Sequence, residues 1–240
     1  MEIQIAVAKI NKYASSESGD TVEVIERPNG GLSVVMADGQ SSGKGAKSIS
    51  TMVVRKVISL LAEGVRDGAA ARASSDYLYT ERVGKVSACL HILSVDMQAG
   101  TLVITRNSPT PVFKARGERI ECLASESVAI GTSRNIRPVI TELPLESDTT
   151  IVLYTDGIMY AGERYGAPID VCMLLESLLE DQSPSSQLIA DSLLNNAISL
   201  DQGRPNDDMS VVVLRVLPSE SDSIRRMTVR LPVADPPNFS

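Results

Sequence analysis

The residues of this sequence best suited to chemistry are acidic, and they stand where apolar strand patterns begin or end. Asp38 and Asp156 each follow an apolar run. Asp20, Asp207 and Asp208 each precede one. A buried strand fixes the backbone beside such a residue, so its carboxylate can point into a cleft. Carboxylates that gather there repel one another unless a proton or a metal ion neutralises them.

These positions offer only oxygen ligands. The lone histidine, His91, lies in an apolar strand pattern typical of a core residue, so a mechanism that needs two histidines is excluded. Oxygen ligands favour Mg²⁺ or Mn²⁺ over Zn²⁺. Two such ions about 4 Å apart can share a carboxylate and activate a water for attack on phosphorus. The sequence therefore suggests a hydrolytic metal site.

A short hairpin is expected to bring Asp20 close to Asp38. Strand-like residues 20–25 and 32–37 flank the turn signal Pro-Asn-Gly-Gly at 28–31. The lengths on the two sides of the turn are roughly in register. Asp20 at the start of one strand therefore faces Asp38 at the end of the other.

A second buried strand, residues 150–155, ends in Asp156-Gly157 and repeats this design. Residues 209–217 form another strand, which Asp207 and Asp208 precede. If the two strands are antiparallel neighbours, the first residues of one lie beside the last residues of the other. The pattern leaves open which of Asp207 and Asp208 faces the site.

The other elements form a meander, which predicts antiparallel sheets and excludes a βαβ array. Asp67 is the expected cap of the second helix. Helices are predicted over 45–63, 67–80, 169–179 and 185–200, and further strands over 2–10, 86–95, 101–106, 112–115, 119–123 and 137–143.

Composition narrows the function classes. The chain has 240 residues, a net charge of −7 and no Trp. An acidic chain is a poor partner for nucleic acid, and no apolar run is long enough to span a membrane. The three cysteines lack a CxxC pair, so reduced, buried thiols and a cytoplasmic location are predicted. They are Cys89, Cys122 and Cys172.

The ordered motifs Ser-Gly-Asp (18–20), Ala-Asp-Gly (37–39), Tyr-Thr-Asp-Gly (154–157) and Asp-Asp-Met-Ser (207–210) resemble those of the metal-dependent, protein phosphatase 2C-like serine/threonine phosphatases. The match is to the bacterial SpoIIE branch and its small stand-alone RsbX-like members. The resemblance implies an α+β fold in which two antiparallel sheets pack face to face with helices on both outer faces. The resemblance covers roughly residues 3–217. A phosphatase domain is predicted over 1–217, and residues 218–240 are expected to form a C-terminal extension with an edge strand and a flexible tail.

The resemblance also implies a role for each acidic residue. Asp38 resembles the ligand that bridges two Mn²⁺ or Mg²⁺ ions, and Gly39 would add its backbone carbonyl. Asp20 resembles a ligand of one ion, and Asp156 a ligand of the other. Asp207 takes the next ligand position with Asp208 beside it. The implied reaction is direct attack of a metal-bridged water on phosphoserine or phosphothreonine of a STAS-domain signalling protein.

Two departures and several alternatives accompany this assignment. Ser41 stands where the branch commonly has glycine, and residues 107–111 differ from its usual Asn-Ala-Gly-His-Pro loop. The Asp-Gly pairs could be ordinary turns. A non-catalytic phosphoprotein-binding module and a small-molecule phosphatase stay open. Lys9, Lys12 and Arg27 are candidates for a basic group that orients the phosphate, and neither the choice among them nor the oligomeric state is predicted.

Overall fold

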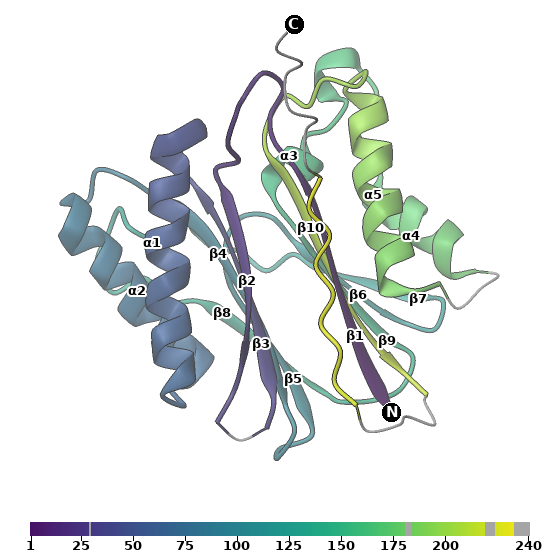
Figure 1. Ribbon diagram of the computed structural model, residues 1–240, viewed down its shortest axis with the longest axis horizontal. Coiled ribbons are helices and arrows are strands. Elements are labelled where there is room, and N and C mark those ends of the chain that lie inside the picture. The colour runs from purple at the N-terminus through teal and green to yellow at the C-terminus, as the bar shows by residue number, and fades with distance from the viewer. Residues whose placement is uncertain (29, 181–183, 219–223, 233–240) are drawn as a thin grey trace, which may run out of the picture.

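Two five-stranded antiparallel sheets pack face to face, and helices cover both outer faces (Figure 1). This computed structural model describes residues 1–28, 30–180, 184–218 and 224–232. The predicted fold class is confirmed. Asn29 of the predicted hairpin turn and the predicted flexible tail at 233–240 lie outside the described residues.

The first sheet has the strand order β1-β10-β9-β6-β7. Its strands β10 and β9 are buried almost throughout, because a sheet between another sheet and a helical layer is covered on both faces. The strands are β1 (Glu2–Ile10), β6 (Val112–Arg116), β7 (Arg119–Leu123), β9 (Thr149–Tyr154) and β10 (Met209–Leu217).

The second sheet has the order β2-β3-β4-β5-β8. The chain crosses into it through residues 11–19, between β1 at one sheet's edge and β2 at the other's. The strands are β2 (Asp20–Glu26), β3 (Leu32–Gly39), β4 (Ala88–Asp96), β5 (Thr101–Asn107) and β8 (Val139–Pro144).

One helical layer covers each sheet. α1 (Gly43–Ala62) and α2 (Asp67–Arg82) lie on the second sheet, and α4 (Val171–Leu179) and α5 (Ser186–Leu200) lie on the first. Two short elements, α3 (Asp156–Met159) and the 3₁₀ helix η1 (Glu163–Tyr165), follow β9. α1 turns one apolar stripe towards its sheet, as its period predicts. That stripe includes Ile49, Val53, Val57 and Leu61.

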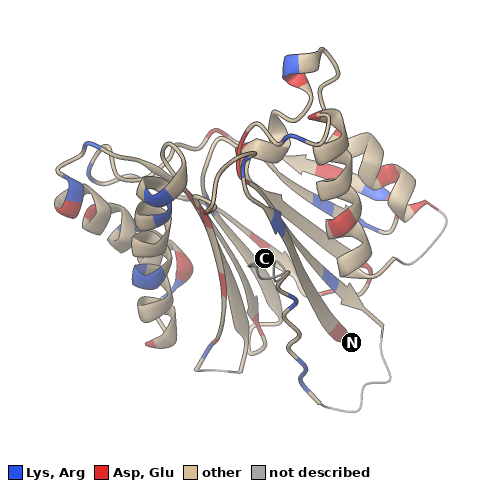
Figure 2. Cartoon of the chain, turned by 45° about the horizontal axis from the view of Figure 1, so that its top comes forward, with Lys and Arg blue, Asp and Glu red and all other residues tan. Residues whose placement is uncertain are grey.

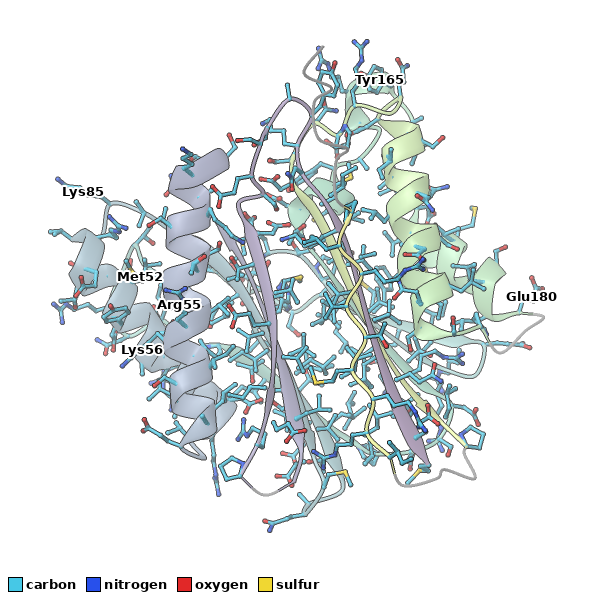
Figure 3. All side chains as sticks on the ribbon, viewed as in Figure 1. Met52, Arg55, Lys56, Lys85, Tyr165 and Glu180 are labelled. Atoms are coloured by element: carbon cyan, nitrogen blue, oxygen red, sulfur yellow. The ribbon has the colours of Figure 1, made fainter. Side chains whose placement is uncertain are left out.

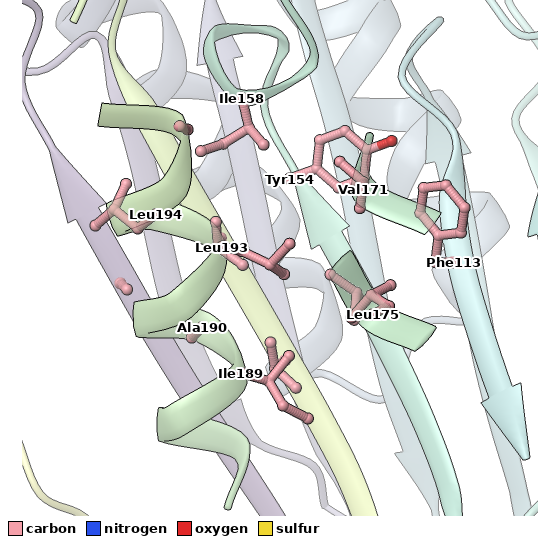
Figure 4. Close-up of a cluster of buried hydrophobic side chains, with 14 of the residues drawn as sticks. Phe113, Tyr154, Ile158, Val171, Leu175, Ile189, Ala190, Leu193 and Leu194 are labelled. Atoms are coloured by element: carbon pink, nitrogen blue, oxygen red, sulfur yellow. The ribbon is translucent and has the colours of Figure 1, made fainter. Parts of the chain in front are cut away.

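The apolar interior forms three layers. The middle layer lies between the sheets and is aliphatic, with Met36, Leu93, Leu153 and Val212 among its fully buried members. The layer under α4 and α5 is shown in Figure 4 and includes the stacked rings of Phe113 and Tyr154. The third layer lies under α1 and α2. Strands held on both sides in this way are rigid supports for side chains at their ends.

Two local predictions are wrong. Asp67 does not cap α2, because the N-cap is Arg66 and Asp67 is already helical and pairs with Arg27 at 2.8 Å. The predicted C-terminal edge strand is absent from the described residues 224–232, which belong to no strand. Their apolar side chains are exposed, so no sheet face stabilises them there. These side chains are Ile224, Met227, Val229 and Leu231.

Candidate metal centre

Three of the predicted acidic residues line one cavity. Asp38 comes from the end of β3, Asp156 from the start of α3 and Asp207 from the residues that precede β10. The cavity has a volume of about 350 Å³. Its remaining lining residues are Lys12, Gly39, Gln40, Ser41, Ser42, Ser87, Ala88 and Cys89. The two sheets thus deliver carboxylates from three distant chain segments to one place.

Asp20 lies directly across the hairpin from Asp38. The two residues are paired in the register of β2 and β3, as the hairpin pattern predicts. Asp20 is 1% exposed and does not line the cavity itself. It therefore stands behind Asp38, at the junction of the two sheets.

Two hydroxyl groups of the opposite sheet hold the Asp20 carboxylate. Thr155 donates to Oδ2 at 3.0 Å, and Ser210 donates to the same oxygen at 2.6 Å. The Ser210 amide donates in turn to the Thr155 hydroxyl at 3.0 Å. Oδ1 of Asp20 is buried and has no partner among the described residues. That oxygen is the one left for a cation or a water.

The two neighbouring residues Asp207 and Asp208 have different environments. Asp208 is buried, and its carboxylate accepts hydrogen bonds from the amides of Lys12 and Gly19, both at 2.8 Å. It thereby fastens the crossover of residues 11–19 to the start of β10. Asp207 is half-buried and lines the cavity. The geometry favours Asp207 as the ligand and gives Asp208 a positioning role.

Both Asp-Gly pairs need glycine because other backbone lies against them. A Cβ on Gly39 would come within 2.2 Å of the Ala46 carbonyl oxygen in α1, and a Cβ on Gly157 within 2.1 Å of the Asp208 carbonyl oxygen. Neither glycine has a left-handed φ. The motifs are therefore not the hairpin turns that Asp-Gly commonly forms. They are close contacts that pack the site's elements together.

Ser41 departs from ordinary backbone geometry. Its φ is 76°, in the region that favours glycine, and its side chain is exposed beside the cavity. A left-handed residue with a Cβ costs about 1–2 kcal/mol, so the serine that replaces the usual glycine is strained. The strain lies in the turn that joins Asp38 to α1.

Three carboxylates of the site have raised pKa values, so their environment disfavours the ionised form. Burial, together with the neighbouring carboxylates of Asp20 and Asp156, raises the pKa of Asp38 to about 9. Burial also raises the pKa of Asp20 to about 7, while hydrogen bonds from Ser210 and Thr155 oppose the change. The pKa of Asp156 is raised by burial and by Asp207. A cation bound among these three carboxylates would stabilise their ionised forms and so lower all three pKa values.

The residues fit hard divalent ions in chemistry but not as a closed cage. The donor set consists of oxygens, one of them orphaned on Asp20, which suits Mg²⁺ or Mn²⁺. In the described part of the chain, no three acidic, histidine or cysteine side chains form a ready ligand group. Mg²⁺ keeps several waters and takes only one or two carboxylates directly, so an open arrangement suits it.

The three basic candidates separate clearly. Lys12 lines the cavity, with Nζ 4.0 Å from Asp207. Lys9 donates to the Asp20 carbonyl at 3.0 Å and sits behind the site. Arg27 is remote, since it pairs with Asp67 and donates to the Val65 carbonyl. Among the candidates, only Lys12 is placed to meet a phosphate.

Sequence reasoning missed several residues of the site. Lys47 of α1 donates to the Asp20 carbonyl at 2.8 Å and to the Thr21 hydroxyl at 2.9 Å. Thr155 and Ser210 stood inside the recognised motifs and received no role. The one feature of the sequence that could have indicated their role is their position close to Asp156 and Asp208 in these motifs.

The cysteines differ from the expectation in one respect. All three are free thiols, but Cys122 is exposed and the other two are partly exposed, so they are not buried as predicted. Cys89 pairs with Asp38 across β3 and β4 and lines the cavity. Although Cys89 is only partly buried, loss of solvent around its thiol raises the pKa to about 12, which keeps it protonated and unreactive.

The architecture is that of a PP2C-like phosphatase fold. The PP2C phosphatase domain of SpoIIE from Bacillus subtilis, solved with a fragment of its regulatory domain, superposes with a TM-score of 0.78 and 21% identity. The match covers 90% of this chain and 64% of that one. RsbX, solved in complex with magnesium, superposes with a TM-score of 0.67 and 15% identity over 88% of this chain and 94% of its own.

Sequence comparison specifies the family. Residues 28–217 match the family Stage II sporulation protein E (SpoIIE), and the chain belongs to that family. It is 21% identical to stage II sporulation protein E of Priestia megaterium and 23% identical to that of Bacillus subtilis (strain 168), in each case over 89% of this chain. The matched regions make up only 36% and 26% of those relatives.

Proposed function

We propose that this chain is a Mg²⁺- or Mn²⁺-dependent phosphatase that hydrolyses phosphoserine and phosphothreonine in proteins. The observation that carries the proposal is the convergence of Asp38, Asp156 and Asp207 on one cavity, with Asp20 in register behind Asp38. Membership of the SpoIIE family supports it. The magnesium in the RsbX structure supports the choice of metal.

Each residue has a separate task in this proposal. Asp38, Asp156, Asp207 and the Gly39 carbonyl would hold two ions, with Asp20 completing the set directly or through water. Ions held there supply Lewis-acid chemistry that activates water and neutralises charge on the phosphate. Lys12 at the cavity wall attracts and orients the phosphate. Asp208, Thr155 and Ser210 hold the ligand-bearing segments in place.

The experiment is hydrolysis of an aryl phosphate in three conditions: with Mn²⁺, with EDTA and with Mn²⁺ in an Asp38→Asn variant. Turnover with Mn²⁺, its loss in EDTA and a fall of at least about 100-fold in the variant are expected, because loss of one central charge-stabilising group costs roughly that much. Turnover that persists in EDTA, or a fully active variant, would contradict the proposal.

The expected natural substrate is a phosphorylated STAS-domain protein of a stress-signalling partner switch. This part rests on resemblance to the stand-alone members of the family. Incubation with phosphorylated STAS proteins from the same organism, followed by measurement of protein-bound phosphate, tests it. A cytoplasmic location belongs to the same proposal and is supported by the three free thiols.

One observation favours a second candidate, a non-catalytic module that binds phosphoproteins. Within the described residues, no ready group of three ligand side chains is present. Calorimetric titration with Mn²⁺ separates the two candidates. Binding of metal supports the phosphatase, whereas binding of a phosphoprotein without metal binding or turnover supports the module.

A further inference from the structure

We propose that the face formed by α1, α2 and residues 131–138 is a docking surface for an acidic segment of the protein substrate. The inference rests on the proposed phosphatase function. It concerns substrate residues outside the phosphorylated one, which the metal centre does not contact.

This face is basic in a chain that is acidic. Residues 43–85 and 131–138 contain ten Lys and Arg but only four Asp and Glu, whereas the whole chain has a net charge of −7. None of the ten forms an ion pair with a described residue. Figure 2 shows several of them on α1 and α2, and Figure 3 shows Lys85 extending outward from this layer. The ten are Lys44, Lys47, Arg55, Lys56, Arg66, Arg72, Arg82, Lys85, Arg134 and Arg137. Lys47 is hydrogen-bonded to the Asp20 carbonyl, which leaves nine for a partner.

A hollow of about 650 Å³ lies within this face. Arg72 and Asp76 line it from α2, and Asn135, Arg137 and Pro138 line it from the loop. Pockets for small ligands are mostly apolar, and this lining is charged and polar. Two arginines beside one hollow suit carboxylates, which guanidinium groups bind through paired N–H donors.

Contacts within the face order several of its groups in advance. The Arg134 guanidinium lies 4.9 Å from the centroid of the Tyr79 ring, and Lys56 Nζ lies 5.4 Å from that of Tyr77. The Asn135 amide donates to Asp76 Oδ1 at 3.3 Å, which ties the loop to α2. Groups that are already ordered lose less entropy when a partner binds.

The hollow is joined to the metal centre through the backbone. Ala88, which lines the site cavity, exchanges two hydrogen bonds with Ile130, of 3.0 and 2.9 Å. Residues 131–138 follow Ile130 directly. The Asn107 side chain also donates to the carbonyls of Val128 and Arg137, both at 3.4 Å. The loop that lines the hollow therefore starts beside a wall of the site cavity, so a substrate segment that extends along this loop would reach the hollow.

The chemistry favours acidic protein over nucleic acid. Asp76 in the lining would repel a continuous phosphate backbone, whereas separate Glu and Asp side chains can be directed to Arg72 and Arg137. The net charge of −7 opposes long-range attraction of a polyanion. The local basic face still attracts carboxylates at short range.

The test measures binding of a fluorescent peptide by anisotropy in EDTA, so that no turnover takes place. The peptide carries phosphoserine followed by glutamates, and a second peptide carries glutamines in their place. The variants are Arg72→Glu, Arg137→Glu and the double reversal. The matched control is Arg119→Glu, an exposed arginine of β7. The double reversal is expected to lower the affinity for the acidic peptide at least about tenfold. It should also make binding less dependent on salt, because charges at an interface rim act in this way.

Each outcome has a defined meaning. Unchanged binding in the double reversal, an equal loss in Arg119→Glu, or equal affinity for the glutamine peptide overturns the docking surface. A single-stranded RNA serves as the competitor: if it binds more tightly than the acidic peptide and this binding is lost in the same variants, the surface binds nucleic acid and the proposal is overturned. Aryl phosphate hydrolysis is measured in parallel. If the wild-type protein does not hydrolyse aryl phosphate, the proposed phosphatase function is overturned. The acidic docking surface is still supported in that case if the charge-reversal variants lose affinity for the acidic peptide.

Discussion

At the scale of single residues, the hydroxyls of Thr155 and Ser210 decide which oxygen of Asp20 is free. Both donate to Oδ2, and they reach it across the interface between the sheets. A donor pair on one oxygen fixes the carboxylate plane and leaves Oδ1 for a cation or a water. These residues therefore belong to the support of the site.

Replacement of Thr155 by valine is expected to weaken Mn²⁺ binding by about 10–100-fold, the usual effect of losing an outer-shell partner. Valine keeps the shape and loses the donor. Calorimetric titration gives the affinity, and Thr155→Ser should restore most of it. The control is Thr105→Val, because Thr105 is equally buried and its hydroxyl has no partner among the described residues. Equal affinity in Thr155→Val and wild type would refute the role.

His91 makes the folded state sensitive to acid. Burial lowers the pKa of His91 to about 4, while a hydrogen bond with the Thr110 backbone opposes the change. The folded pKa lies below the ordinary value of 6.5. Its stabilising contribution is therefore complete above pH 6.5 and is lost as the pH falls towards 4, when the unfolded chain takes up the proton.

Between pH 7 and pH 5 this group alone should cost about 2 kcal/mol of unfolding free energy. Urea unfolding at the two pH values measures it, with His91→Gln as the comparison. The carboxylates titrate in both proteins, so the difference between the two isolates His91. The same pH dependence in both proteins would show that the histidine is not the cause.

Sequence reasoning at this scale succeeded where a residue stands at a strand end. The position of Asp38 follows from the hairpin register, and that of Asp207 from the start of β10. It failed for Thr155 and Lys47, because their bonds to Asp20 join residues that are distant in the chain and depend on how elements pack. The choice between Asp207 and Asp208 likewise needed the amides of Lys12 and Gly19.

At the scale of elements, the turn between β3 and α1 carries the strain of the site. Ser41 holds a left-handed φ of 76° without the freedom of glycine. Gly39 has no room to adjust its backbone in compensation, because it packs directly against the backbone of Ala46. The turn joins the candidate metal centre to α1, which is one of the two helices that form the basic face.

Ser41→Gly is expected to stabilise the protein by about 1 kcal/mol, because glycine adopts this φ without steric cost. Urea unfolding in EDTA measures the change. A matched control is Ser42→Gly, which acts on an extended residue and should destabilise slightly. A destabilising effect of Ser41→Gly would mean that the serine makes a contribution that outweighs its strain.

Element boundaries were predictable from period and turn signals, with characteristic failures. The helical stripe of α1 and the meander of β4 to β7 follow from pattern alone. The prediction that Asp67 caps α2 failed because its carboxylate pairs with Arg27 of the β2–β3 hairpin. The C-terminal edge strand failed because its alternating apolar residues find no sheet face to cover.

At the scale of the whole molecule, the two sheets bring like charges together at the cost of stability. The charges of Asp20, Asp38, Asp156 and Asp207 gather at one end of the sandwich, and the pKa of Asp38 is raised accordingly. The fold tolerates this because three aliphatic layers stabilise it elsewhere. Active sites commonly trade stability for function in this way.

Asp38→Asn is therefore expected to raise the melting temperature in EDTA by roughly 2–4 °C, which corresponds to about 1 kcal/mol for a domain of this size. Mn²⁺ should raise the melting temperature of the wild-type protein and have little effect on the variant. Differential scanning calorimetry measures both. A variant that melts below the wild type in EDTA would show that Asp38 stabilises the metal-free fold.

The layered architecture was predictable as a whole because the resemblance covered most of the chain and the hairpins specified antiparallel pairing. The crossover of the chain between sheets at residues 11–19 was not, since it depends on the bonds made by Asp208. Neither was the hollow beside α2, which forms only when the loop at 131–138 packs against that helix.

The most direct test of the central claim is anomalous diffraction from crystals of this chain soaked in Mn²⁺. The account predicts two manganese peaks in the cavity between Asp38, Asp156 and Asp207, with Asp38 in contact with both, and loss of both peaks in Asp38→Asn. Manganese found elsewhere, or an empty cavity at saturating Mn²⁺, would contradict the assignment of these carboxylates as a metal centre.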